Sequence, residues 1–186
     1  MSNNGNIKEI SDAKIAISGK SGCGNTTVSR LVADALGLRF INFTFRSLAQ
    51  EKGLTLKDVL ALAAADDFWD KEVDTRQVDL AREHGGCVLG SRLAIWMLPE
   101  ADLKVFLTAD CEIRAKRIHI REGGDIETVA ELTAARDMQD RERYQRIYKI
   151  DNDIYSFADL IINTDNIAPQ NIAETIISEL KRKLSL

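Results

Sequence analysis

The sequence lacks the features that mark several classes of protein. Its three cysteines, Cys23, Cys87 and Cys111, form no CxxC pair, which argues against a disulfide framework or a zinc knuckle. No apolar run approaches the roughly 20 residues that span a bilayer, and the polar start MSNNGNIKEIS has no apolar signal region. We therefore expect free thiols, no membrane segment and a cytoplasmic protein.

The chain also lacks an excess of basic residues. It has 25 Lys and Arg against 29 Asp and Glu, a net charge of −4, and the two signs are mixed along the sequence. A surface that coats nucleic acid is therefore not expected. No low-complexity tract or flexible linker interrupts the 186 residues, so we predict one domain over residues 13–186 behind a polar tail at 1–12.

Segments with strand patterns alternate with helical segments along the whole chain. The predicted strands are residues 13–18, 39–43, 87–90, 103–108 and 159–163. Helices are predicted at 26–36, 92–98, 111–122, 125–150 and 169–183. Residues 44–84 carry no strand pattern and are predicted to be a helical insert. This alternation indicates an α/β fold, with a parallel sheet covered on both faces.

Residues 19–27 (GKSGCGNTT), called the phosphate loop below, follow the first predicted strand and open a helix. Gly19, Gly24 and Thr26 fit the pattern G-x-x-x-x-G-K-[ST]. Glycines let the backbone amides turn inward, and the positive end of the helix adds to a pocket for phosphate oxygens. We therefore predict a nucleoside triphosphate site, with the Thr26 hydroxyl placed to bind Mg²⁺.

The lysine of this pattern is absent, because Asn25 stands at its position. Asparagine donates a hydrogen bond but carries no charge. Lys20, inside the same loop, has two interpretations: it restores the missing cation, or it is a solvated surface lysine. The sequence leaves both open.

Arginines follow where a phosphoryl-transfer site would need positive charge. Arg46 and Arg92 come just after the second and third predicted strands, at the edge where ligands of open α/β folds bind. Others crowd two predicted helices: Arg114, Arg117, Arg121, Arg136, Arg141, Arg143 and Arg146. These helices are either a movable lid, hinged at the Gly123-Gly124 break, or a solvated surface with Glu–Arg pairs. The second interpretation is favoured for Arg114 and Arg146.

Together these stretches resemble a nucleoside monophosphate kinase, and within that group the short cytidylate kinases of the archaeal type. The resemblance covers residues 13–180, and its matching stretches are GKSGCGNTT, FRSLAQEKG, DKEVDTRQVDLA, GSRLAIWML, RERYQRIYKID and DLIINTD. It implies a three-layer P-loop fold with a five-stranded parallel sheet in the order 2-3-1-4-5. It also implies an acceptor-binding role for the insert at 44–84 and an arginine-rich lid at 117–150.

The resemblance implies a monomer that transfers the γ-phosphate of Mg-ATP to CMP or dCMP. Arg46 and Arg92 would clamp the acceptor phosphate, and Asp74 and Arg76 would either help to read cytosine or form a plain surface pair. The residues that would bind the ATP phosphates are Gly19, Lys20, Ser21, Gly22, Cys23, Gly24, Asn25, Thr26 and Thr27. The arginines that would close over the transferred phosphoryl group, beside Lys20, are Arg117, Arg121, Arg136 and Arg143.

Two residues depart from the family pattern. Asn25 replaces the lysine of the general loop pattern, at a position where related sequences often carry threonine. Gly90 stands where family members usually carry a carboxylate that would help to hold the Mg²⁺ water shell. These departures keep two other interpretations open: a nucleotide-binding module that has lost catalysis, and a P-loop kinase for another small acceptor.

Overall fold

Within the described residues, five parallel strands form one sheet in the order β2-β3-β1-β4-β5, which confirms the predicted order. In chain order they are β1 (Lys14–Gly19), β2 (Arg39–Ile41), β3 (Cys87–Gly90), β4 (Leu103–Thr108) and β5 (Leu160–Asn163). The computed structural model describes residues 9–83 and 85–186. Most of the predicted tail at 1–12 lies outside these ranges, whereas Ile10–Asp12 form a short 3-10 helix whose Ser11 carbonyl accepts a hydrogen bond from the Gly86 amide.

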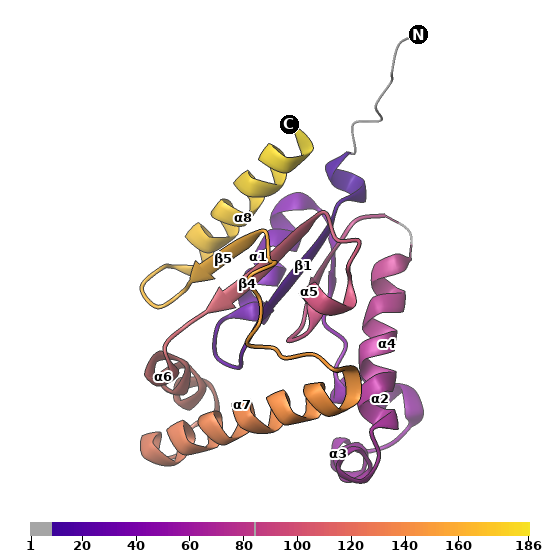
Figure 1. Ribbon diagram of the computed structural model, residues 1–186, viewed down its shortest axis with the longest axis vertical. Coiled ribbons are helices and arrows are strands. Elements are labelled where there is room, and N and C mark those ends of the chain that lie inside the picture. The colour runs from indigo at the N-terminus through magenta and orange to yellow at the C-terminus, as the bar shows by residue number, and fades with distance from the viewer. Residues whose placement is uncertain (1–8, 84) are drawn as a thin grey trace.

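Helices cover both faces of the sheet and its carboxyl edge (Figure 1). They are α1 (Asn25–Leu36), α2 (Phe45–Lys52), α3 (Leu56–Ala65), α4 (Phe68–Arg82), α5 (Ala94–Met97), α6 (Cys111–Glu122), α7 (Ile126–Tyr148) and α8 (Pro169–Leu184). Three of them, α2 to α4, occupy the segment predicted to be a helical insert. The predicted strand at 39–43 is shorter than expected, because only Arg39–Ile41 pair with β3.

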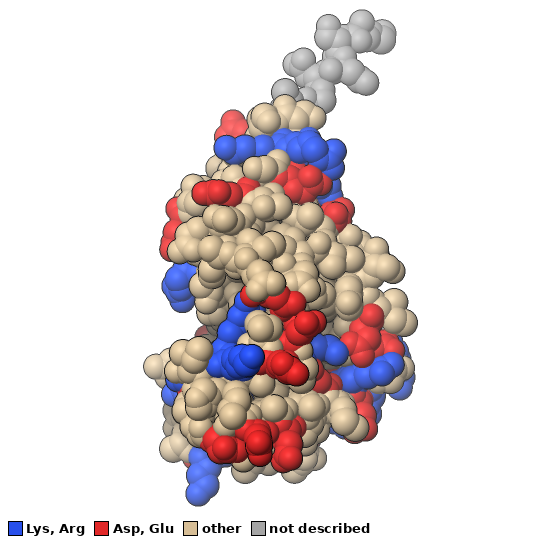
Figure 2. All heavy atoms as spheres, turned by 90° about the vertical axis from the view of Figure 1, so that its left-hand side faces the viewer, with Lys and Arg blue, Asp and Glu red and all other residues tan. Residues whose placement is uncertain are grey.

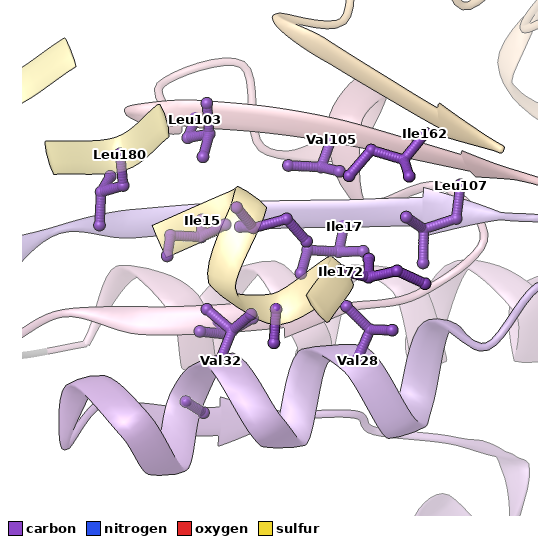
Figure 3. Close-up of a cluster of buried hydrophobic side chains, with 14 of the residues drawn as sticks. Ile15, Ile17, Val28, Val32, Leu103, Val105, Leu107, Ile162, Ile172 and Leu180 are labelled. Carbon is purple, nitrogen blue, oxygen red and sulfur yellow. The ribbon is translucent and has the colours of Figure 1, made fainter. Parts of the chain in front are cut away.

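The alternation of side chains along each strand explains why the sheet is buried on both faces. Ile15 and Ile17 on β1 point to one face and pack with α1 and α8, as Figure 3 shows. Ala16 points to the other face, where α5 and the end of α4 cover the sheet. All three side chains are fully buried. The sheet is therefore a rigid platform for the loops at its carboxyl edge.

Helix α7 lies across this carboxyl edge, from α6 on one side to α4 on the other (Figure 1). It is 23 residues long but polar, and no helix in the described residues is long and apolar enough to cross a membrane. The face shown in Figure 2 carries acidic and basic side chains in small mixed groups.

Candidate active site

One cavity of about 740 Å³ lies at the carboxyl edge of the sheet, between the phosphate loop, α4, α6 and α7. All nine residues of the phosphate loop line it. The other predicted site residues that line it are Asp74, Arg92, Arg117, Arg121, Arg136 and Arg143. The fold thus brings most of the predicted site residues around one chamber, although they are up to 124 positions apart in the sequence.

Asn25 takes the first position of α1 and folds back over the loop. Its Nδ2 donates a hydrogen bond to the Gly19 carbonyl at 2.7 Å, while its Oδ1 is buried with no partner among the described residues. Burial raises the pKa of the neighbouring Cys23 thiol to about 11, so this cysteine is an uncharged wall of the loop at neutral pH. Asn25 therefore stabilises the shape of the loop and adds no charge to it.

Lys20 lines the cavity, but its ammonium group forms an ion pair with Asp153 at 2.7 Å. The Lys20 side chain is 30 % exposed. The charge of Lys20 is thus largely balanced by a carboxylate from the segment that connects α7 to β5.

Two arginines of α6 hold the loop through its carbonyl oxygens. Arg114 donates to the Ser21 carbonyl at 3.1 Å, and Arg117, one turn further along, donates to the Gly22 carbonyl at 3.2 Å. Arg114 also binds Asp137 of α7 and is only 5 % exposed. The prediction of a solvated Arg114 was wrong, because the face of α6 that carries it packs directly against the loop.

Arg92, just after β3, connects the loop to α7. Its Nη2 donates to the Ser21 hydroxyl at 2.9 Å, and its Nη1 pairs with Asp140. Arg143 binds the other oxygen of Asp140 at 2.8 Å and also pairs with Asp70 at 3.2 Å. Burial raises the pKa of the Asp140 carboxyl, although Arg92 and Arg143 oppose that shift. One buried carboxylate therefore holds two arginines of the cavity.

An acidic face of α4 meets α7 along what we call the α4–α7 seam. The contacts that define it are Asp67 with Arg146, Asp70 with Arg143, and Asp74 with Tyr148. The three aspartates fall at offsets 0, 3 and 7, on one side of the helix. Arg146 is exposed, as predicted, with 61 % of its side chain accessible to solvent. It also forms an ion pair with Asp67 across the seam.

Asp74 is the partly buried acidic group of the seam that contacts Tyr148. The Tyr148 hydroxyl donates to it at 2.7 Å and the Gln77 amide at 3.2 Å. Burial raises the pKa of Asp74 to about 6, against the opposing effect of the Tyr148 hydrogen bond. Gln77 is buried and lines the cavity, and only its place one turn after Asp74 could have indicated it from the sequence.

Two predicted acceptor residues lie outside the cavity wall. Arg46 is exposed on α2, and Arg76 pairs with Glu51 of α2 at 3.4 Å. Within the wall, Arg121 pairs with its neighbour Glu122, whereas Arg117 and Arg136 form no ion pair with any described residue. Some cationic side chains of the cavity are therefore paired with a carboxylate, whereas Arg117 and Arg136 have no carboxylate partner among the described residues.

A magnesium ion would find a small set of oxygen ligands here. No group of three or more His, Cys, Asp or Glu in the described residues could hold a metal. The Thr26 hydroxyl lines the cavity and accepts a hydrogen bond from Asn42 at 3.3 Å. At Gly90 a Cβ atom would lie 2.5 Å from the Ser29 hydroxyl, so the missing carboxylate has no room. One hydroxyl suits Mg²⁺, which keeps several waters and binds substrate phosphates.

The sheet order, the phosphate loop and the arginine-lined cavity define a P-loop kinase. The chain belongs to the cytidylate kinase-like family, whose model matches residues 14–166. It is 45% identical to cytidylate kinase 2 of Borreliella burgdorferi over 174 residues, 91% of this chain and 96% of that protein. It is 41% identical to the cytidylate kinase of Pyrococcus horikoshii over 160 residues, 85% of this chain and 83% of that one.

A solved structure supports the fold alone. Shikimate kinase from Acinetobacter baumannii, in complex with shikimate, superposes with a TM-score of 0.63 at 18% sequence identity. The match covers 92% of this chain and 94% of that one.

Proposed function

We propose that this protein transfers the γ-phosphate of ATP to CMP, giving ADP and CDP. A phosphate oxygen of CMP attacks the γ-phosphorus while the bond from that phosphorus to the leaving oxygen of ADP breaks. The observation that carries the proposal is the shared cavity, in which the phosphate loop faces arginines of α6 and α7 and the polar wall of α4. The cytidylate kinase relatives support CMP as the acceptor.

The phosphate loop would hold the ATP phosphates with its backbone amides and the positive end of α1. Thr26 would bind Mg²⁺, which when bound neutralises charge between the β- and γ-phosphates. Arg117, Arg121, Arg136 and Arg143, with Lys20, would surround the transferred group. Among these, Arg117 and Arg136 form no ion pair in the described chain and are therefore available for phosphate without breaking one.

Arg92 would bind the acceptor phosphate, because it lies beside the loop at Ser21. The base would lie against α4, where Asp74 accepts hydrogen bonds and cytosine offers an amino group. Arg46 and Arg76 stay candidates for the acceptor side only if α2 and α4 shift, since neither lines the cavity in this conformation. The proposal further takes the protein to be a monomer acting on free nucleotides.

The arginines of the cavity favour a kinase over a binding module that has lost catalysis. A module that only binds a nucleotide needs the loop, but not further guanidinium groups grouped opposite it. Six cationic side chains of the described residues line this cavity: Lys20, Arg92, Arg117, Arg121, Arg136 and Arg143.

The test is ADP release with Mg-ATP and a panel of acceptors: CMP, dCMP, UMP, AMP and shikimate. We expect turnover with CMP or dCMP, and CDP or dCDP as the product by chromatography. Arg182→Gln, an exposed change on α8 outside the cavity, is the control and should keep the wild-type rate. ATP binding without turnover of any acceptor would contradict the proposal and favour the binding module.

A further inference from the structure

Thr164, the second-last residue of the stretch DLIINTD, lies at a position that suggests a function. Thr164 follows β5 directly, is 1 % exposed and lines the cavity behind the phosphate loop. Its single hydroxyl hydrogen lies within reach of two carbonyl oxygens, those of Cys23 and Thr108, each at 3.1 Å. The first of these carbonyls belongs to the phosphate loop, so β5 contacts the loop through Thr164.

The same threonine fixes Arg117. The guanidinium of Arg117 donates to the Thr164 hydroxyl oxygen at 2.9 Å and to the Thr164 carbonyl at 2.6 Å. Its other acceptors are the Asp165 carbonyl at 3.4 Å and the Gly22 carbonyl of the loop at 3.2 Å. All four acceptors are neutral, and no carboxylate in the described chain pairs with Arg117, which therefore keeps its full charge beside the loop.

The position of Arg117 gives the phosphate loop a positive charge that its sequence lacks at position 25. The loop has Asn25 where the pattern has a cation, and Lys20 is already paired with Asp153. A guanidinium bonded to a peptide carbonyl polarises that peptide group and raises the local positive potential. The charge of Arg117 thus lies beside the Gly22 end of the loop, at the wall of the cavity.

We propose that Thr164 is a positioning residue of the phosphate loop, which holds Arg117 against the Gly22 carbonyl and so supplies positive charge to a loop that has no lysine at position 25. The proposal rests on the proposed binding of ATP at this loop. Thr164 is therefore expected to affect the binding of ATP and not the binding of the acceptor.

The test compares Thr164→Val, which removes the hydroxyl at nearly constant volume, with Thr164→Ser, which keeps it. Thr133→Val is the matched control: Thr133 is likewise buried, at 2 % exposed, but among the described residues its hydroxyl bonds only to the Val129 carbonyl of its own helix. We expect Thr164→Val to raise the Kd and KM for Mg-ATP about tenfold, as loss of a hydrogen bond to a charged group does. The KM for CMP should change less than twofold.

The serine variant should recover most of the ATP affinity, and Thr133→Val should lower the Tm without changing the Kd for Mg-ATP. The proposal is wrong if Thr164→Val binds Mg-ATP with the wild-type Kd, or if Thr133→Val raises the Kd for Mg-ATP as much as Thr164→Val does. Wild-type protein that binds no Mg-ATP would instead contradict the proposed function, so the two failures are distinct.

A second set of variants covers the case in which Thr164→Val does not fold. Arg117→Gln should raise the Kd for Mg-ATP at least about tenfold, and adding Asn25→Lys should restore most of that loss by returning the charge to the loop. The single variant Asn25→Lys shows how much the loss of the hydrogen bond from Asn25 to the Gly19 carbonyl changes the Kd by itself. An Arg117→Gln protein that Asn25→Lys does not improve would overturn the role of Arg117 as a source of charge.

Discussion

The two sides of the cavity hold their arginines in different ways. On the loop side, Arg117 binds carbonyl and hydroxyl oxygens and keeps its charge. Along the α4–α7 seam, Arg143 is paired with Asp70 and Asp140, and Arg146 with Asp67. Neutral oxygen acceptors hold an arginine side chain in place without offsetting its positive charge. A carboxylate partner offsets that charge unless another anion displaces it. On the loop side a phosphate therefore meets a guanidinium without a carboxylate partner, whereas at Arg143 it would have to displace Asp70 and Asp140.

The largest effect is expected on the loop side, from Gly22→Ala. Gly22 has a left-handed φ of 86°, and an added Cβ would lie 2.8 Å from the carbonyl oxygen of Arg114. The loop must move away from α6, and a displacement of about 1 Å costs about 100-fold in rate. We expect that loss in kcat/KM for ATP, measured by ADP release.

Gly37→Ala is the control for backbone strain. Gly37 ends α1 with a φ of 65°, but nothing lies within 4 Å of its added Cβ. It should cost stability and leave the kinetics unchanged. Equal losses from both alanines would show that left-handed strain, not contact with α6, explains the result at Gly22.

On the seam side, Asp140→Asn should lower the free energy of unfolding by about 1–3 kcal/mol, as loss of a charge-assisted hydrogen bond does. The change leaves Arg92 and Arg143 without their shared carboxylate. Urea unfolding at pH 7 measures it. A stability equal to wild type would show that the two arginines are held by other contacts.

The acidity of Asp74 predicts a pH dependence for the acceptor. Because its pKa is raised to about 6, Asp74 gains a proton as the pH falls from 7.5 to 5, and a protonated acid accepts a hydrogen bond from cytosine poorly. Its charged neighbours are Asp70, Arg143 and Arg92, with Tyr148 as its hydrogen-bond donor. We expect the KM for CMP to rise by about tenfold between these pH values.

Asp74→Asn separates this effect from the titration of CMP itself, whose phosphate also ionises near pH 6. The variant should start from a higher KM at pH 7.5 and show a smaller rise toward pH 5. Identical pH profiles for the two proteins would rule out Asp74 as the titrating group.

The smallest effect is expected from Arg146→Gln at the exposed end of the seam. Arg146 is 61 % exposed and Asp67 is 34 % exposed, and such pairs contribute about 0–1 kcal/mol. Thermal unfolding should change little, and the KM for CMP should stay within twofold. A loss as large as that of Asp140→Asn would contradict the distinction between the buried and exposed parts of the seam.

Much of the fold could be predicted from the sequence, because hydrophobic periodicity marks buried strands and amphipathic helices directly. The predicted helix at 111–122 is observed as Cys111–Glu122, and that at 125–150 as Ile126–Tyr148. The sheet order came from the resemblance of several motifs together. Strand β2 was overestimated, since side-chain pattern does not show where backbone pairing with a neighbour ends.

The candidate site could be predicted only in part. The spacing of the phosphate loop identifies its residues, but periodicity cannot tell which face of α6 meets that loop, so Arg114 was assigned to solvent. Long-range partners are also invisible: Thr164 is more than 40 positions from Arg117, and Gln77 acquires its place only when α4 folds against the cavity. Polar residues of this kind carry no local signal that separates a site from a surface.

In the proposed reaction the loop side binds ATP, and the α4–α7 seam binds the acceptor at its cavity end, around Asp74. The most direct measurement is the KM for ATP and for CMP in two variants, Arg117→Gln and Asp74→Asn. We expect a crossed result: Arg117→Gln raises the KM for ATP about tenfold or more with little change for CMP, and Asp74→Asn raises the KM for CMP with little change for ATP. Variants that each raise both KM values to the same extent would contradict the division between the two sides.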